Sequence, residues 1–362
     1  MNFGLSEDQV LLKTTIKRFL EEQCPTTRVR AIMESDSGHD TGLWQGLVDL
    51  GVPGLTIPAA YGGAGLELLD LALAAEELGY AATPGPFLGS AMATVALLEG
   101  GDASQREHWL PRLASGKALA TIAFGEADSQ WDPAHYASKA SGGTLTGTKP
   151  LVPYASAADA IVVAATDGTG PGLWLVERGA PGIEITPLKV IDLTRRVESV
   201  RFNGTPAVKL GGDVAALQRA IDAGCILIAA DAYGGSRRCL EMTVQYAQQR
   251  EQFGQIIGAF QAVKHQIANM ACELEPSLSL YWYAAHAFDR IRDQSERHAA
   301  LVKAHMTDLY DRITRDSTEL HGGIGFTWEF DLHLWFRRAL FDRSFLGEAA
   351  VHRARAAELA GW

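Results

Sequence analysis

The chain has 362 residues, which is enough for two or three domains with a substantial hydrophobic core. Its 47% hydrophobic and 21% charged residues are typical of a globular protein and exclude a disordered or fibrous chain. The 32 basic and 43 acidic residues give a net charge of -11, which disfavours binding to nucleic acid or to an anionic membrane surface.

The cysteines and the N-terminus indicate a protein of the reducing cytoplasm. Cys24, Cys225, Cys239 and Cys272 form no CxxC pair and no zinc-ligand spacing, so we expect neither a disulfide framework nor a metal site. Residues 1–8 are polar and acidic, and they lack the basic segment with which a signal peptide begins. No apolar stretch is long enough to cross a bilayer, so we expect no membrane-spanning helix.

Residues 1–118 are predicted to be helical. Ser6 and Gln9 are spaced as a capping box, and an apolar stripe with helical spacing follows from Leu12 to Leu20. Pro25 is expected to end this helix. Further helices are expected at about 41–51, 66–80, 88–98 and 105–113.

The remaining sequence first changes to strands and then returns to helices. Short apolar or alternating runs separated by Gly, Pro, Asp and Ser fill residues 119–212, which is typical of an antiparallel sheet or barrel. Residues 213–362 are rich in Ala, Leu, Arg and Glu and contain few helix breakers. We therefore predict an α+β fold with an N-terminal helical domain (1–118), a middle antiparallel β-barrel-like domain (119–212) and a C-terminal four-helix bundle (213–362). The absence of βαβ alternation argues against a Rossmann domain.

One candidate binding segment lies at a predicted turn between two long helices, at residues 246–265. The first helix is expected to end near Gly254, and Arg250, Phe253 and Gln261 surround the turn. An arginine there can bind a pyrophosphate through its guanidinium, and an aromatic ring beside it can cover a flat ring system. The alternative is a solvated arginine beside a core phenylalanine.

A second candidate segment is the sequence ELHGGIGFTWE at residues 319–329. Its three glycines allow the backbone to approach a ligand closely and to offer N–H groups to phosphate. It does not follow a predicted strand and is no GxGxxG motif. The alternative is a tight turn between two helices.

Together these segments make the chain resemble the acyl-CoA dehydrogenase family over about residues 5–358. Arg250-x-x-Phe253-Gly254 followed by residues 257–261 (IGAFQ) is similar to that family's FAD-contacting turn, and residues 320–326 (LHGGIGF) are similar to its C-terminal glycine loop. The resemblance implies that Arg250, Phe253 and Gln261 contact the FAD of a neighbouring subunit. It also implies that the glycine loop, at Gly322 and Gly323, passes close to the dinucleotide.

The resemblance also implies an activity, the α,β-desaturation of an acyl-CoA thioester. In the family a carboxylate removes the α-proton while the β-hydrogen leaves as hydride to FAD, which an electron-transfer flavoprotein usually reoxidises. Subunits of such enzymes form tetramers, so we expect a homo-oligomer or an assembly with a paralogous acyl-CoA dehydrogenase subunit.

The chain departs from the family where a catalytic carboxylate is expected. Leu346 stands at the position of the usual glutamate, and Glu348 lies two residues away. Some members carry the base on the long helix before the FAD-contacting turn, where this chain has Gly224. Asp231 lies seven residues further along the same side of that helix, among apolar neighbours that would raise its pKa, which suits a general base. The alternative is that Asp231 pairs with a buried polar group.

A third departure concerns the middle domain, where two family segments normally lie against the flavin ring. Here they are residues 124–132 and 151–155, and Pro153 lacks the N–H that a strand could donate to the ring. Such a loss is expected if two different subunits share each FAD. Heteromeric enzymes of bacterial steroid side-chain degradation are built in this way, and residues 325–334 resemble that subgroup. The chain is thus expected to be an acyl-CoA dehydrogenase subunit, or alternatively a non-catalytic partner that completes the FAD site of a catalytic paralogue.

Overall fold

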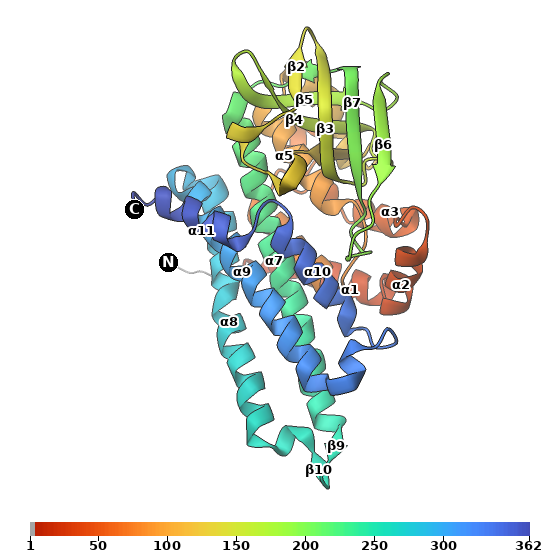
Figure 1. The fold of residues 1–362 in the computed structure, drawn as a ribbon, viewed down its shortest axis with the longest axis vertical. Helices are drawn as coiled ribbons and strands as arrows, with labels where there is room; N and C mark the ends of the chain where they lie inside the picture. The colour runs from red at the N-terminus through yellow and green to blue at the C-terminus, as the bar shows by residue number, and fades with distance from the viewer. Residues whose placement is uncertain (1–3) are drawn as a thin grey trace. The chain divides into compact units, whose positions relative to one another are not determined.

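The computed structural model describes residues 4–362 and has helices at both ends of the chain with a sheet between them (Figure 1). The predicted absence of a signal peptide rests partly on residues 1–3, which lie outside the described residues. The helices are α1 (Glu7–Gln23), α2 (Thr26–Glu34), α3 (Thr41–Asp49), α4 (Leu68–Tyr80), α5 (Phe87–Gly100), α6 (Ala103–Ala114), α7 (Asp213–Gln249), α8 (Gln261–Arg290), α9 (Arg292–His321), α10 (Leu332–Ser344) and α11 (Ala349–Glu358). The strands are β1 (Ala120–Ala123), β2 (Lys139–Ser141), β3 (Thr144–Pro153), β4 (Ala160–Asp167), β5 (Gly170–Glu177), β6 (Ile183–Pro187), β7 (Val197–Pro206), β8 (Val208–Lys209), β9 (Glu251–Gln252) and β10 (Gln255–Ile256).

The predicted order of a helical, a strand-rich and a second helical region is confirmed. The capping box is present, because Ser6 Oγ accepts from the Gln9 N–H at 3.2 Å and Gln9 Oε1 accepts from the Ser6 N–H at 3.0 Å. The domain boundaries at 118 and 212 stay a prediction. By contact density the chain forms two compact units: unit 1 comprises Met1–Met33, Ala72–Thr83 and Ile226–Trp362, and unit 2 comprises Glu34–Leu71 and Pro84–Cys225.

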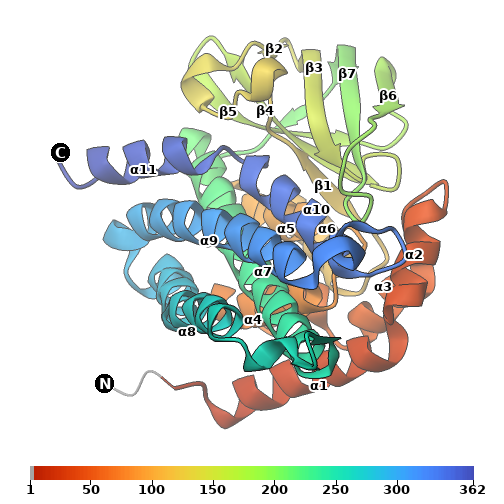
Figure 2. The same cartoon turned by 60° about the horizontal axis from the view of Figure 1, so that its bottom comes forward.

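Unit 1 is a bundle of long helices. The part of α7 from Ile226 onwards runs beside α8 and α9, and α10 and α11 pack against α9 (Figures 1 and 2). Apolar residues of α7 from Ile226 to Ala230 are buried, as are most inward positions of α9. The apolar side chains that recur with helical spacing in the sequence therefore form one continuous core, as expected for a helical bundle.

Unit 2 contains an open mixed sheet. Among the described residues, eight strands follow the order β6-β7-β3-β2-β4-β5-β8, with β1 beside β4. Most neighbours are antiparallel, but β1 pairs with β4 in parallel and so does β2. The predicted middle domain of mostly antiparallel strands is confirmed. Its sheet is open, however, and does not close into a barrel. Alternation along single strands cannot reveal which strands meet.

Helix α5 lies close against β1 in unit 2. A Cβ on Gly89 would stand 2.6 Å from Thr121 Oγ1, so only glycine allows this approach. The adjoining sheet core is formed by apolar side chains of β3, β4, β5 and β7, with Trp174 and Phe202 as the largest members.

A buried ion pair joins strand β3 to the segment after β1. Lys149 Nζ donates to Glu126 Oε1 at 2.7 Å, and it also lies 4.3 Å from the centre of the Tyr136 ring. Burial lowers the pKa of Lys149 to about 8, against the attraction of Glu126. The Ser138 N–H donates to the same carboxylate oxygen at 3.0 Å, so this oxygen gathers two donors.

Helix α2 and the hairpin of β9 and β10 are among the elements that were not predicted. Helix α2 begins one residue after Pro25, which the sequence analysis used only as a stop signal, although proline is also common just before or at a helix start. The short strands β9 and β10 lie inside what was expected to be a plain interhelical turn.

Replacing Lys149 by Met tests the buried pair. The change leaves the Glu126 carboxylate buried without its cation, so we expect a loss of about 3–5 kcal/mol in the free energy of unfolding. Urea unfolding followed by circular dichroism measures it. Lys149→Met combined with Glu126→Gln should recover part of the loss, and an additive double variant would contradict the pairing.

Candidate functional site

The turn between α7 and α8 is a β-hairpin. Strands β9 and β10 pair antiparallel, and the two residues between them, Phe253 (φ +53°) and Gly254 (φ +81°), both have left-handed backbone. Two consecutive left-handed residues form a tight turn whose twist matches that of the two paired strands. The turn leaves the Phe253 side chain 93% exposed at its tip, in contact with the edge of Phe260. A strained backbone that presents an aromatic ring to its surroundings is typical of a binding element.

Arg250 and Gln261 stand at the base of this hairpin. The Arg250 backbone accepts a hydrogen bond from the Ile257 N–H at 2.7 Å, which closes the hairpin onto the end of α7. The Arg250 side chain is exposed and has no ion pair within residues 4–362. Gln261 is exposed and is the first residue of α8, where the free N–H groups and the helix dipole favour an anion.

The glycine loop begins where α9 ends. His321 closes α9, and Gly322–Phe326 form one short 3-10 helix, η6. Gly322 has φ +62° and Gly323 is also exposed, and open space lies where a Cβ would stand on either residue. The loop thus offers an uncovered backbone, as a diphosphate requires.

An aromatic stack brings the hairpin and the glycine loop to one end of unit 1. The Tyr246 ring, one turn before Arg250, stacks on the His321 ring with centres 4.4 Å apart and planes 25° apart. Phe330 packs on the His321 ring at 4.9 Å. His321 Nδ1 bonds to the Ser317 carbonyl at 2.7 Å, and burial lowers the pKa of His321, so the ring is neutral near pH 7. The five predicted FAD-contacting residues therefore belong to two neighbouring turns.

The loop at the position of the family's usual base is ordered and carries no carboxylate. Leu346 is 2% exposed with φ +63°, a strained conformation for a side chain of this size. Lys303, fully buried, donates to the carbonyls of Asp342 at 2.8 Å and Gly347 at 3.1 Å. His352 Nε2 lies 2.9 Å from the Leu346 carbonyl, and Glu348 is exposed at the N-cap of α11.

Asp231 forms a buried ion pair. Arg338 donates to Asp231 through Nε at 2.8 Å and Nη2 at 2.6 Å, and both side chains are almost fully buried. Arg338 Nη1 also donates to the Thr83 carbonyl at 3.0 Å. A carboxylate held on both oxygens by one guanidinium is poorly suited to accept a substrate proton. This geometry corresponds to the structural alternative for Asp231 and gives no support to the predicted catalytic role, which stays a prediction.

The two segments expected to face a flavin lie in unit 2, and the second lacks one backbone donor at Pro153. The backbone of Pro153 has no N–H, and its carbonyl already accepts from Thr121 Oγ1 at 2.5 Å. Gly125, just before Glu126, packs against the Trp131 ring so closely that a Cβ would lie 3.1 Å from it. Leu151 occupies a left-handed position at φ +57°.

The sequence analysis missed the residues that position these segments. Lys303, His352 and Tyr246 lie in helices whose apolar periodicity gave no indication of their contacts. For Lys303 the sequence did contain one signal, because this lysine falls on the apolar side of the helical pattern of α9. Within residues 4–362 no group of three or more metal-ligating side chains is arranged around a metal position.

Comparison with known proteins identifies the class that this fold and site define. Residues 6–117 match the family model for the N-terminal domain of acyl-CoA dehydrogenases, and residues 213–360 match the model for their C-terminal domain. The chain belongs to the acyl-CoA dehydrogenase family, whose members are FAD-dependent oxidoreductases. No described helix is long and apolar enough to cross a membrane.

Particular relatives are similar over nearly the whole chain. Acyl-CoA dehydrogenase IpdE2 of Mycolicibacterium smegmatis is 33% identical over 345 residues, covering 95% of this chain and 96% of the relative. A structure described as a Tcur3481–Tcur3483 steroid ACAD variant has a TM-score of 0.92 and 31% identity and covers 98% of each chain. The ChsE4–ChsE5 complex of Mycobacterium tuberculosis has a TM-score of 0.90 and 26% identity and covers 100% of this chain and 99% of that one.

The variant Asp231→Asn distinguishes the two roles of Asp231. Because the change leaves the buried Arg338 guanidinium without its anion, we expect a loss of about 3–5 kcal/mol in the free energy of unfolding. Thermal unfolding measures it. A variant of unchanged stability whose assembly had lost acyl-CoA-dependent flavin reduction would instead support the catalytic role.

His352 predicts a pH dependence of stability. Burial, with the nearby Lys303 charge, lowers the pKa of His352 to about 3 from an ordinary 6.5. Between these pH values the unfolded chain binds a proton that the folded chain excludes, so stability falls as pH falls through this window. We expect the wild type to lose more stability than His352→Gln between pH 7 and pH 4.5, measured by urea unfolding; parallel pH curves would contradict the assignment.

Proposed function

We propose that this chain is one subunit of a heteromeric acyl-CoA dehydrogenase, in which it completes the FAD site of a catalytic paralogue. In this assembly Arg250, Phe253 and Gln261, with the glycine loop at Gly322 and Gly323, contact FAD held mainly by the neighbouring subunit. The paralogue supplies the carboxylate that removes the α-proton. The observation that carries the proposal is an asymmetry within this chain. The residues expected to contact a neighbouring subunit's FAD are present, whereas the expected base at position 346 and the backbone donor at position 153 are absent.

The end of unit 1 supports the first half of this asymmetry. The Arg250 guanidinium suits a pyrophosphate, since it is exposed and has no acidic partner among the described residues. The exposed Phe253 ring suits a flat ring system, and the uncovered glycine backbone suits a close approach of the dinucleotide. These residues fit FAD that arrives from outside the chain.

The residues that would hold a flavin ring within this chain support the second half. Pro153 gives no N–H, Gly125 gives no side-chain hydroxyl, and Leu346 gives no carboxylate. Asp231 is bound to Arg338 through both carboxylate oxygens, and Glu348 is exposed at the start of α11, two residues from position 346. A base must reach the α-proton within hydrogen-bond distance, and we expect neither carboxylate to do so.

The chemistry of the assembly follows from the family. Bound FAD supplies the hydride acceptor for desaturation of the acyl-CoA, and reoxidation by an electron-transfer flavoprotein belongs to the same proposal. The printed descriptions of two similar structures name a steroid ACAD and a complex of two different proteins. We therefore include a steroid side-chain thioester as the substrate class, a tetramer as the assembly and the cytoplasm as the location.

The second candidate function is a homomeric enzyme that catalyses the reaction alone. Its support is family membership, and it requires a base in this chain, for which the sequence offers Asp231 on α7. The two candidates differ in flavin content, because a homomer binds FAD in every chain. They also differ in whether acyl-CoA bleaches the flavin of the chain expressed by itself.

We expect the chain expressed alone to be colourless or poorly soluble, and the co-expressed complex to hold half as many FAD molecules as polypeptides. In that complex, Arg250→Ala should weaken FAD retention about tenfold because a charge-assisted contact to phosphate is lost. Flavin absorbance against protein concentration, after dilution and gel filtration, measures both quantities.

The control variant is Arg315→Ala, an exposed arginine of α9 whose Nε bonds to Asp311 one turn away at 3.0 Å. It should retain FAD as the unmodified complex does. A homomer with one FAD in every chain would overturn the proposal, as would equal FAD loss in the Arg250 and Arg315 variants.

A further inference from the structure

A cavity of unit 1 is not part of the proposed FAD site. It measures about 300 Å³, which is the lower limit for a small-molecule pocket, and lies between α1, α4, α7 and α10. Lys17, Leu20, Cys24, Tyr80, Arg238 and Trp335 are among its lining residues.

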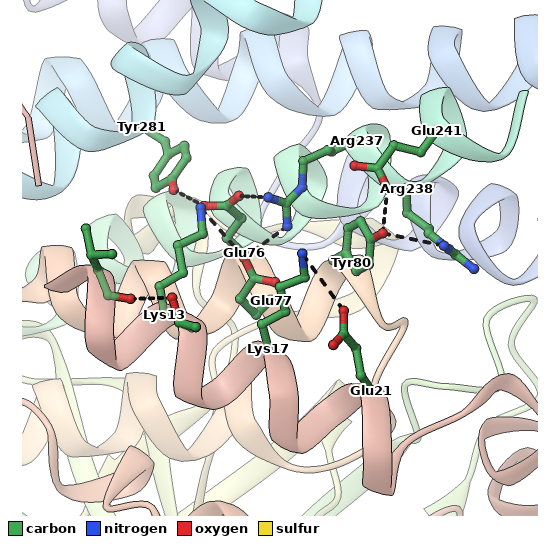
Figure 3. Close-up of polar contacts among 12 residues, drawn as sticks. Lys13, Lys17, Glu21, Glu76, Glu77, Tyr80, Arg237, Arg238, Glu241 and Tyr281 are labelled. Carbon is green, nitrogen blue, oxygen red and sulfur yellow. Dashed lines mark hydrogen bonds and ion pairs between the residues drawn. The ribbon is translucent and has the colours of Figure 1, made fainter. Parts of the chain in front are cut away.

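Cations gather around one aromatic ring in this cavity. Arg237 lies 4.6 Å, Arg238 5.4 Å and Lys17 5.9 Å from the centre of the Tyr80 ring, and Arg238 also lies 5.7 Å from the Trp335 ring (Figure 3). Contacts of this kind hold the guanidinium plane of Arg238 while its N–H groups remain available for an acceptor.

The two neighbouring arginines differ in their partners. Arg237 is bound to two buried carboxylates, with Nη1 at 3.3 Å from Glu76 and Nη2 at 2.9 Å from Glu77. Arg238 has one polar contact, from Nη1 to the Tyr80 hydroxyl at 3.4 Å, and no carboxylate within ion-pair distance among residues 4–362. Arg238 therefore has donors to spare beside the cavity, and Arg237 does not.

Each acid around the cavity already accepts from, or pairs with, at least one donor of the protein. Glu76 accepts from Lys13 Nζ at 2.6 Å and from the Tyr281 hydroxyl at 2.5 Å (Figure 3). Glu77 lies 3.6 Å from Lys13 Nζ in addition to its Arg237 partner, and burial raises its pKa. Glu241 accepts from the Tyr80 hydroxyl at 2.5 Å.

Lys17 is held only weakly by its own acid. Its Nζ lies 3.9 Å from Glu21, an exposed pair of i, i+4 spacing, and such pairs contribute little. The Lys17 ammonium can therefore turn from Glu21 to a ligand at small cost. Buried side chains of Leu20, Cys24 and Trp335 supply apolar surface in the same cavity.

We infer that this cavity binds a small organic acid, with its carboxylate between Arg238 and Lys17 and its apolar body against Leu20, Cys24 and Trp335. The inference is independent of the proposed function, because no residue of the hairpin or the glycine loop takes part. Glu77 Oε2, which has no hydrogen-bond partner among the described residues, forms part of the wall and would accept from a hydroxyl of such an acid.

Ligand-observed NMR titration of the full chain, in the assembly in which it purifies, tests the inference with phenylacetate as the probe. We expect saturable binding, and at least tenfold weaker binding for Arg238→Gln and for Lys17→Gln, because each removes a charged donor from the carboxylate. Arg238→Lys should retain part of the affinity. Lys17 lies on the partly exposed face of α1, so its variant keeps the test valid if Arg238→Gln does not fold.

The matched control is Arg18→Gln, which removes an exposed cation from the same helix beside Lys17. It should bind phenylacetate as the unmodified chain does. Stronger binding of phenethylamine than of phenylacetate would overturn the inference, because it would assign the site to the carboxylate of Glu77. Affinity that the Arg238 and Lys17 variants leave unchanged would overturn it too, as would absence of binding at about 10 mM, beyond the range of a specific small ligand.

Discussion

The stack of Tyr246 on His321 holds together the two turns that carry the predicted FAD-contacting residues. It joins the end of α7 to the end of α9, and each helix then continues directly into an exposed turn. His321 is buried and Tyr246 is half-buried, so the stack is part of the packing of the bundle. Arg250 and Phe253 on one turn, and Gly322 on the other, therefore follow directly from helices that pack against each other.

The buried pair of Asp231 and Arg338 shows why a carboxylate on the right helix is not enough for catalysis. Burial alone would raise the affinity of the carboxylate for a proton, but a guanidinium on both oxygens stabilises its charged form. Removing either partner leaves an isolated charge in an apolar interior, which is far more costly than the net contribution of the pair. The pair therefore joins α7 to α10 as a structural unit.

The sequence predicted the order of elements because helical and alternating periodicities are properties of neighbouring residues. It predicted the capping box and most helix positions for the same reason. The open order of the strands, the parallel strand pairs and the Asp231–Arg338 contact depend on residues far apart in the chain, and periodicity contains no information about them. The hairpin at Phe253 was missed because its two strands have two residues each, too short for a pattern.

The loop around Leu346 is held at its backbone. Lys303 and His352 reach the loop at carbonyl oxygens, which every amino acid possesses, so these hydrogen bonds do not depend on the side chain at position 346. An alkyl group therefore occupies position 346 without removing these hydrogen bonds. The scaffold of the loop is thus independent of whether its central side chain can accept a proton.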